Sequence, residues 1–239
     1  MAKSITMAAA RILLFLRLCK FIISDYPLSK YIGDYYSMKY PVFASFIIFI
    51  LLVRHNIRRN RRIEENTEKA FWERERKAND VRRKPLDDLV YIKPDMSSFP
   101  TDVMADDPEI AECRELLGEL ENSKIVNLTG LTNTDLKLRY GVANLKTLTE
   151  YDDRFTLLVQ TIQKWADRLW ENGYTKEAIP LLEEQVRIHA DITSAYRKLA
   201  VYYRDNNESG KIENLRKTAE TLNSSSKNVI LKSLDEIQG

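Results

Sequence analysis

Residues 41 to 53 carry no charge and consist of one Pro, one Ser, one Ala and large apolar residues. Thirteen residues of helix rise only about 20 Å, whereas the apolar core of a bilayer is about 30 Å thick. Extending the segment back to Tyr35 adds Tyr35, Tyr36 and Tyr40, and tyrosines favour the headgroup region. We therefore predict a transmembrane helix over 35–53, in preference to a buried helix of a soluble domain.

Five arginines follow this apolar stretch directly: Arg54, Arg58, Arg59, Arg61 and Arg62. Arginine-rich flanks stay in the cytoplasm, and the anionic lipids of the inner leaflet attract them. We expect these arginines to contact anionic lipid. The protein is therefore predicted at the cell membrane, with the chain from residue 54 onward in the cytoplasm.

A second apolar region covers residues 5–23, but Arg11, Arg17 and Lys20 interrupt it. Each charge near the centre of a spanning helix costs about 2.5 to 3.5 kcal/mol. Two arrangements remain open. The segment is either an amphipathic helix lying in the interface or the first arm of a membrane hairpin, with an external turn over 25–38. Both keep the C-terminal part inside. The charges also disfavour a cleaved signal peptide.

Residues 54–84 contain neither Gly nor Pro and are rich in Glu, Lys, Arg and Ala, which predicts a charged cytoplasmic helix. A coiled coil is disfavoured, because the best heptad register is half polar. Phe71 and Trp72 are the exceptions on this charged helix. They are expected to pack on the following domain or on headgroups, or else to contact a partner.

Four prolines punctuate the next segment, Pro85, Pro94, Pro100 and Pro108, and predict an extended linker over 85–108. A helix is expected to begin after it, with Asp107 as N-cap and Pro108 at its first position. A shorter helix capped by Thr134 is expected to end at Gly141.

Apolar residues then recur with a spacing of 34. The pairs are Ile162 and Tyr196, Trp165 and Leu199, Ala166 and Ala200, Leu169 and Tyr203, Ala178 and Ile212, Leu181 and Leu215, and Ile188 and Leu222. Each unit reads as a helix, a polar turn and a second helix. Small alanines at equivalent positions allow the paired helices to approach closely.

At these residues the chain resembles the tetratricopeptide repeat, whose 34-residue unit has this helix-turn-helix pattern. Trp165, Ala166, Leu169, Gly173 and Ala178 follow the motif of that family. The second unit has Ile212 where the family has Ala, and neither unit has the closing Pro. The resemblance covers repeats at about 155–188 and 189–222, and a helix over 226–236 is expected to cap the open end. The layout is also similar to uncharacterised bacterial membrane proteins that carry an N-terminal anchor and a C-terminal repeat domain.

The resemblance implies binding of a protein or peptide in a groove lined by the first helix of each unit. The matching positions are Gln160, Gln163, Asp167, Trp170 and Glu171 in the first unit, and Ser194, Arg197, Val201, Arg204 and Asp205 in the second. Arg197 and Arg204 beside Trp170 are expected to hold a carboxylate and an apolar side chain. A solvated helix face is the alternative.

Charge divides the chain in the same place as hydropathy. Residues 1–84 carry 18 Lys and Arg against 8 Asp and Glu, a balance of +10, whereas residues 85–239 carry 19 against 27, a balance of −8. A basic half beside an anchor suits anionic lipid, and an acidic half is repelled by phosphate backbones. Nucleic acid is therefore not an expected partner.

Catalytic and metal-binding patterns are not recognised. His55 and His189 have no Cys, Asp or Glu at metal-ligand spacing, and the seven glycines form no phosphate-binding loop. Acidic pairs such as Glu183 and Glu184 read as solvated charges. Cys19 and Cys113 read as small buried residues with no disulfide. We expect no enzyme activity, no cofactor and no metal.

Together these patterns predict an all-α protein with a membrane region over 1–53, a charged helix over 54–84, a linker over 85–108 and a helical-repeat domain over 109–239. The expected function is a membrane-anchored cytoplasmic adaptor or scaffold. The alternative is a structural or regulatory subunit of a membrane complex, with the transmembrane segment as its main interaction surface.

Overall fold

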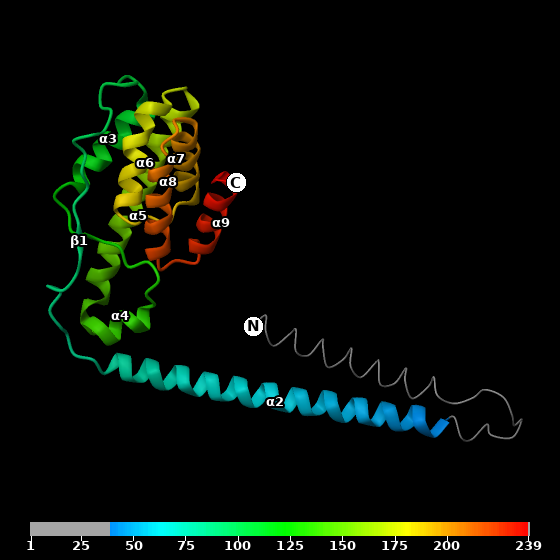
Figure 1. The fold of residues 1–239 in the computed structure, drawn as a ribbon. Coiled ribbons are helices and arrows are strands. Elements are labelled where there is room, and N and C mark those ends of the chain that lie inside the picture. Colours follow the sequence, from blue (N-terminus) through cyan, green and yellow to red (C-terminus); the bar gives the residue numbers. More distant parts are fainter. Residues whose placement is uncertain (1–38, 239) are drawn as a thin grey trace, which may run out of the picture. The chain divides into compact units, whose positions relative to one another are not determined.

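The computed structural model describes residues 39–238 and is mostly helical (Figure 1). The predicted all-α class holds except for one small sheet. The elements are α2 (Lys39–Asn79), β1 (Tyr91–Ile92), α3 (Pro108–Leu120), β2 (Ile125–Val126), α4 (Asn133–Tyr140), the 3-10 turn η1 (Val142–Asn144), α5 (Leu145–Glu171), α6 (Thr175–Arg187), α7 (Thr193–Asp205), α8 (Ser209–Thr221) and α9 (Lys227–Gln238).

The chain divides into two compact units, Met1–Thr67 and Glu68–Gly239. The first unit includes most of α2, and its large apolar side chains between Phe43 and Val53 are all exposed. Among the described helices, none is both long and apolar enough to cross a membrane. The predicted region 5–23 and the first four residues of the predicted segment 35–53 lie outside the described residues.

The last turns of α2 belong to the second unit, where they pack on α4. Ala78 is fully buried, Glu75 pairs with Lys137 and accepts a hydrogen bond from Thr134, and Arg74 pairs with Asp135 at 2.6 Å. The helix predicted over 54–84 therefore ends at Asn79 and is not solvated along its whole length. Its end is a packed part of the folded unit.

The chain leaves α2 along the end of α4. The side chain of Asn144, fully buried, donates to the carbonyls of Lys84 and Tyr140 and accepts from Arg83 Nε. Gly141 has a φ of +86°, and a Cβ there would overlap the carbonyl of Arg82. Only glycine permits this close approach of the two chain segments.

Residues 85–107 form no helix and contain β1 and several turns, and, contrary to the prediction of a linker, they are part of the core. Tyr91 pairs with Val126 and Ile92 with Ile125 in the antiparallel sheet. Phe99 is buried with its ring centroid 5.8 Å from that of Trp165. An apolar side chain that reaches the domain core stabilises the fold, so this segment is a strap across the domain and not a free linker.

The predicted start of α3 is confirmed, because Asp107 caps the helix and Pro108 follows it. Asp107 Oδ1 accepts from the backbone N–H of Glu109 and Ile110, while Oδ2 accepts from Arg168 at 2.9 Å. The predicted cap of α4 is wrong by two residues. Thr132 caps this helix in a reciprocal arrangement with Asp135, because a hydroxyl three residues before a carboxylate satisfies two terminal N–H groups.

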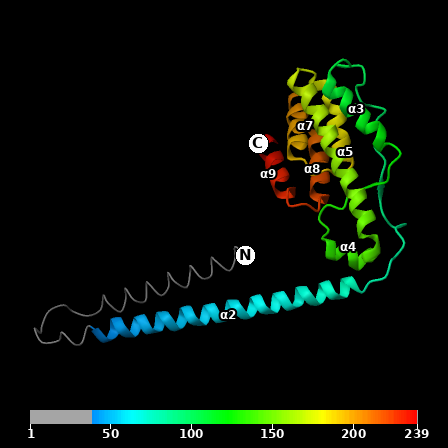
Figure 2. The same ribbon diagram turned by 180° about the vertical axis from the view of Figure 1, so that it is seen from behind.

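All seven residue pairs of the 34-residue spacing are buried, which confirms the predicted inward positions. One difference is length: α5 has 27 residues whereas α6, α7 and α8 have 13 each. Leu145 and Leu148 lie in the first turns of this long helix. The helices α5 to α9 are neighbours in space (Figures 1 and 2), and α9 packs on α7 and α8 with Ile230 and Leu234 buried. The predicted end helix is thus present; it begins one residue later and ends two residues later than expected.

Candidate functional site

Two of the predicted groove positions on α5, Gln163 and Asp167, belong to one polar network. The Gln163 side chain donates to Asp167 Oδ1 at 2.7 Å and accepts from Gln185 Nε2 at 3.1 Å. Trp170 lies one turn further along the same helix and is half-buried. The structure thus brings together Gln163, Asp167 and Trp170, three of the ten predicted groove residues.

The cation beside Trp170 is Lys198, which the sequence analysis did not select. Its Nζ lies 2.6 Å from Asp167 Oδ1 and 5.1 Å from the centroid of the Trp170 ring. A cation over an indole face and against a carboxylate is attracted by both. Lys198 therefore ties α7 to α5 and occupies the place expected for Arg197 and Arg204.

Of the other predicted residues, Gln160 and Glu171 lie exposed on α5, and the rest lie on α7. Arg197 is exposed and has no hydrogen bond or ion pair within residues 39–238, and Val201 is half-buried. Arg204 pairs with its exposed neighbour Asp205 at 3.0 Å. Exposed pairs of this kind contribute little to stability. Arg197 is thus the predicted groove cation that has no partner within residues 39–238, and Val201 lies one turn further along α7.

The predicted lipid-contacting arginines all lie exposed on α2. Arg61 pairs with Glu65 at 3.3 Å. The other four, Arg54, Arg58, Arg59 and Arg62, make no ion pair with any described residue.

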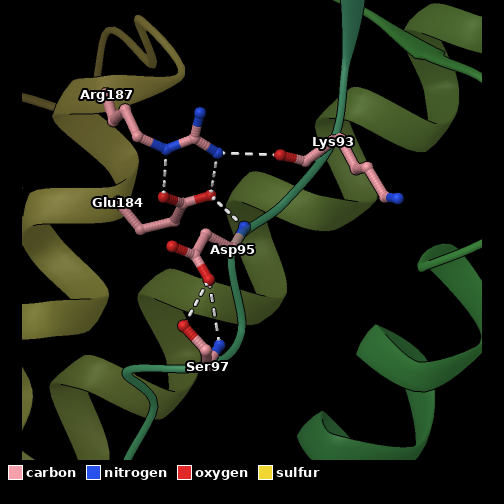
Figure 3. Close-up of polar contacts among 5 residues, drawn as sticks. All are labelled: Lys93, Asp95, Ser97, Glu184 and Arg187. Carbon is pink, nitrogen blue, oxygen red and sulfur yellow. Dashed lines mark hydrogen bonds and ion pairs between the residues drawn. The ribbon is translucent and has the colours of Figure 1, made fainter.

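A second polar cluster fastens the strap to α6 (Figure 3). Glu184 is 5% exposed, so the prediction of a solvated acidic pair is wrong for this residue. Arg187 donates from Nε and Nη2 to the two carboxylate oxygens, at 2.5 and 2.6 Å. This doubly bonded carboxylate raises the pKa of the guanidinium of Arg187. A carboxylate is tolerated at a buried position because it is paired.

The same two side chains bind the backbone of the strap. Arg187 Nη2 donates to the carbonyl of Lys93 at 2.8 Å, and Glu184 Oε1 accepts the N–H of Asp95 at 3.0 Å. Asp95 in turn accepts from the hydroxyl and the N–H of Ser97, and these bonds lower its pKa. The strap is therefore held on α6 by polar contacts at alternate residues.

We call the pair Glu184 and Arg187 the clamp, because it holds the strap on α6. An open pocket of about 510 Å³ adjoins this clamp. One wall is the strap at Val90, Tyr91, Ile92 and Lys93, and the opposite walls are the ends of α6 and α8, with Arg187, Ile188, His189, Asp191, Thr221, Leu222, Asn223 and Ser224; Asn127 and Thr129 complete the lining. Its volume lies within the range of about 300 to 1,000 Å³ that is typical of ligand sites.

His189 closes α6 in a left-handed conformation with φ of +56°. Its N–H bonds the carbonyl of Val186, and the N–H of Ala190 bonds that of Gln185, which is the usual hydrogen-bond pattern of a helix end with a left-handed residue. Gly173 occupies the same place after α5. A histidine at a position that favours glycine is strained, and this one lines the pocket.

Reactive groups are few in the described part. Cys113 is buried, which raises the pKa of its thiol and disfavours the nucleophilic thiolate. Over residues 39–238, no three His, Cys, Asp or Glu side chains are grouped so as to hold a metal ion.

Comparison with models of known protein families, with curated proteins and with solved structures returns no match. The surfaces described above therefore provide the basis for a functional proposal.

Proposed function

We propose that this protein is a membrane-anchored adaptor whose helical second unit binds a protein partner at the cytoplasmic face. The observation that carries the proposal is the character of α2. Its large apolar residues from Phe43 to Val53 are between 40% and 64% exposed, and eight of them are consecutive. Eight consecutive residues cover every face of a helix, so this part is apolar all round and requires lipid or another apolar surface.

The exposed arginines favour lipid and set the orientation. Four of them have no ion-pair partner within the described part of the chain, so their charge is available to anionic headgroups. Arginines at one end of an apolar helix keep that end in the cytoplasm. The second unit is then also cytoplasmic.

The partner is proposed to bind the face formed by α5 and α7, which the resemblance to tetratricopeptide repeats favours. Lys198 holds the two helices together, and Arg197 and Val201 present an unpaired cation beside an apolar side chain. A carboxylate next to an apolar residue on the partner would complement this face.

The test is photocrosslinking in native membranes with the full chain. A photoreactive residue at Val201 should yield one defined adduct, identified by mass spectrometry, which Arg197→Glu diminishes. Lys217→Glu is the matched control, because Lys217 is also exposed, on α8, and has no described partner. Loss of the adduct in both variants, or in neither, would argue against the proposed face.

The alternative subunit role rests on the same exposed apolar residues of α2, since they also suit contact with other membrane helices. Photoreactive residues at Phe46 and Ile50 distinguish the two roles. Protein adducts from these positions together with none from Val201 would favour the subunit role. Lipid adducts from them and a protein adduct from Val201 would favour the adaptor.

A further inference from the structure

The pocket between the strap and the ends of α6 and α8 is separate from the α5–α7 face proposed above. Its strap wall is extended backbone, and Val90, the first residue of that wall, is 81% exposed. Extended backbone beside an open pocket can accept a further strand, as in proteins that bind peptides by adding them to a sheet edge.

The clamp on α6 already bonds the strap backbone in the way that a neighbouring strand would. Arg187 donates to the carbonyl of Lys93, and Glu184 accepts the N–H of Asp95, so one edge of the strap is bonded at alternate residues (Figure 3). In an extended chain, residues two apart point their backbone groups to the same side. By this alternation the backbone groups of Tyr91 lie on the same edge as those of Lys93, whereas those of Ile92 face β2. No described side chain of α6 bonds the backbone at Tyr91. The hydrogen bonds from the clamp therefore end before Tyr91, where the strap lines the pocket.

The opposite wall offers both donors and acceptors, which a peptide backbone requires. It contains the amide of Asn223 and the hydroxyl of Ser224, whereas the hydroxyl of Thr221 donates to the carbonyl of Thr218. The Ser224 hydroxyl is withdrawn from solvent and has no hydrogen-bond partner among the described residues. A polar atom in this condition gains from an incoming partner.

The pocket is held in shape by contacts between its walls. Asn127 donates to the carbonyl of His189 at 3.2 Å. Gly130 has a φ of +86° and lies so close to Asn223 that a Cβ would overlap the carbonyl there. A site that is already in position loses less free energy on binding.

The charged groups around the pocket determine which kind of peptide side chain is favoured there. Lys93 is exposed, and its ammonium group has no partner within residues 39–238. In Figure 3 this group points away from the Glu184 carboxylate. Arg187 uses Nε and Nη2 in the clamp and keeps Nη1 free. Asp191 is the one acidic residue in the pocket lining. An acidic side chain near Lys93 is therefore favoured over a basic one.

From this geometry we infer that the pocket binds an extended peptide segment of another protein, which pairs with the strap edge at Tyr91 and places an acidic side chain near Lys93. The source of binding free energy is backbone hydrogen bonding, with Val90 as an apolar contact. This site acts whether or not the α5–α7 face binds a partner.

A library of random linear peptides displayed on phage provides the probe, selected against the full chain in lipid nanodiscs. Enriched peptides are then synthesised, and their affinities are measured by fluorescence anisotropy. We expect acidic residues in the enriched sequences. A photoreactive residue at Val90 should label these peptides, whereas one at Val201 should not.

Two variants test the binding mode. Tyr91→Pro removes the backbone donor and should weaken binding about fivefold to tenfold more than Tyr91→Ala, which removes the same side chain and keeps the N–H. Lys93→Glu, at an exposed position, should weaken binding of acidic peptides about tenfold, and Lys217→Glu should not. Thermal unfolding verifies that each variant is folded.

Three results would overturn the inference: no enriched peptide, equal affinity of the Pro and Ala variants together with no effect of Lys93→Glu, or labelling from Val201 alone. The last result, and weaker peptide binding in Arg197→Glu, would assign the peptides to the α5–α7 face. Failure of the membrane crosslinking at Val201 leaves the pocket experiment unaffected.

Discussion

Replacing Arg187 and replacing Glu184 in the clamp should lower the stability of the fold by different amounts. The side chain of Glu184 is 4% exposed, whereas that of Arg187 is 51% exposed. Arg187→Ala removes three hydrogen bonds, two to Glu184 and one to the carbonyl of Lys93, and leaves a buried carboxylate that keeps only the N–H of Asp95. Breaking a fully buried pair this way costs about 3 to 5 kcal/mol, so we expect about 3 kcal/mol for this half-exposed one.

Glu184→Ala should cost less, about 2 kcal/mol, because water solvates the half-exposed guanidinium that remains. The double variant should be more stable than Arg187→Ala alone, since it no longer buries an unpaired charge.

The assay is urea unfolding of the full chain in mild detergent, followed by circular dichroism, with Lys217→Ala as the exposed control. The urea midpoints are compared only among variants whose unfolding free energy has the same dependence on urea concentration. A change in stability is then separated from a change in the unfolded state. A deficit for Glu184→Ala equal to or larger than that for Arg187→Ala at neutral pH would refute the reasoning. So would a double variant that is the least stable of the three.

Three further predictions concern other positions. Gly130→Ala should lower the free energy of unfolding by more than 2 kcal/mol and Gly173→Ala by about 1 kcal/mol, as measured by urea unfolding. Both glycines have φ of +86°, but an added Cβ would meet Asn223 at Gly130 and nothing within 4 Å at Gly173. Equal losses would contradict the close approach. Lys198→Ala should cost about 1 kcal/mol in the same assay, since it loses both Asp167 and Trp170, while Arg204→Ala, which loses an exposed pair, should cost close to nothing. Arg168 lowers the pKa of Asp107 below its usual 3.8, so the stability this pair contributes is present above that pH and is lost as the pH falls through the lowered pKa. Asp107→Asn should therefore flatten the acid side of a plot of unfolding midpoint against pH, and an unchanged slope would argue against this cause.

Features that depend on local pattern were predicted from the sequence. The buried positions of the repeat follow from helical periodicity at a fixed spacing of 34, as with Ala166 and Ala200. The start of α3 follows from an Asp before a Pro, since each satisfies a requirement of the first helical turn.

Features that depend on contacts distant in sequence were missed. The strands β1 and β2 are two residues each and lie more than thirty residues apart, so no alternation marks them. Lys198 was passed over because nothing in its neighbours indicates that Asp167 and Trp170 lie across from it. Glu184 did carry a signal, because it lies three residues after Leu181 and four before Ile188, on the buried face of α6. A carboxylate on that face, with an Arg three residues later, indicates a buried ion pair.

The packing of the end of α2 on α4 determines where the chain can be shortened for work in solution. A fragment that starts at residue 109 lacks Phe99, the strand partner of β2 and the Asp95 N–H that Glu184 accepts. One that starts at residue 85 still lacks Ala78, Glu75 and the Arg83 contact to Asn144. A fragment from Glu68 keeps all of these and omits the apolar residues from Phe43 to Val53. The best starting point for a soluble fragment therefore lies inside α2, several turns before this helix ends at Asn79.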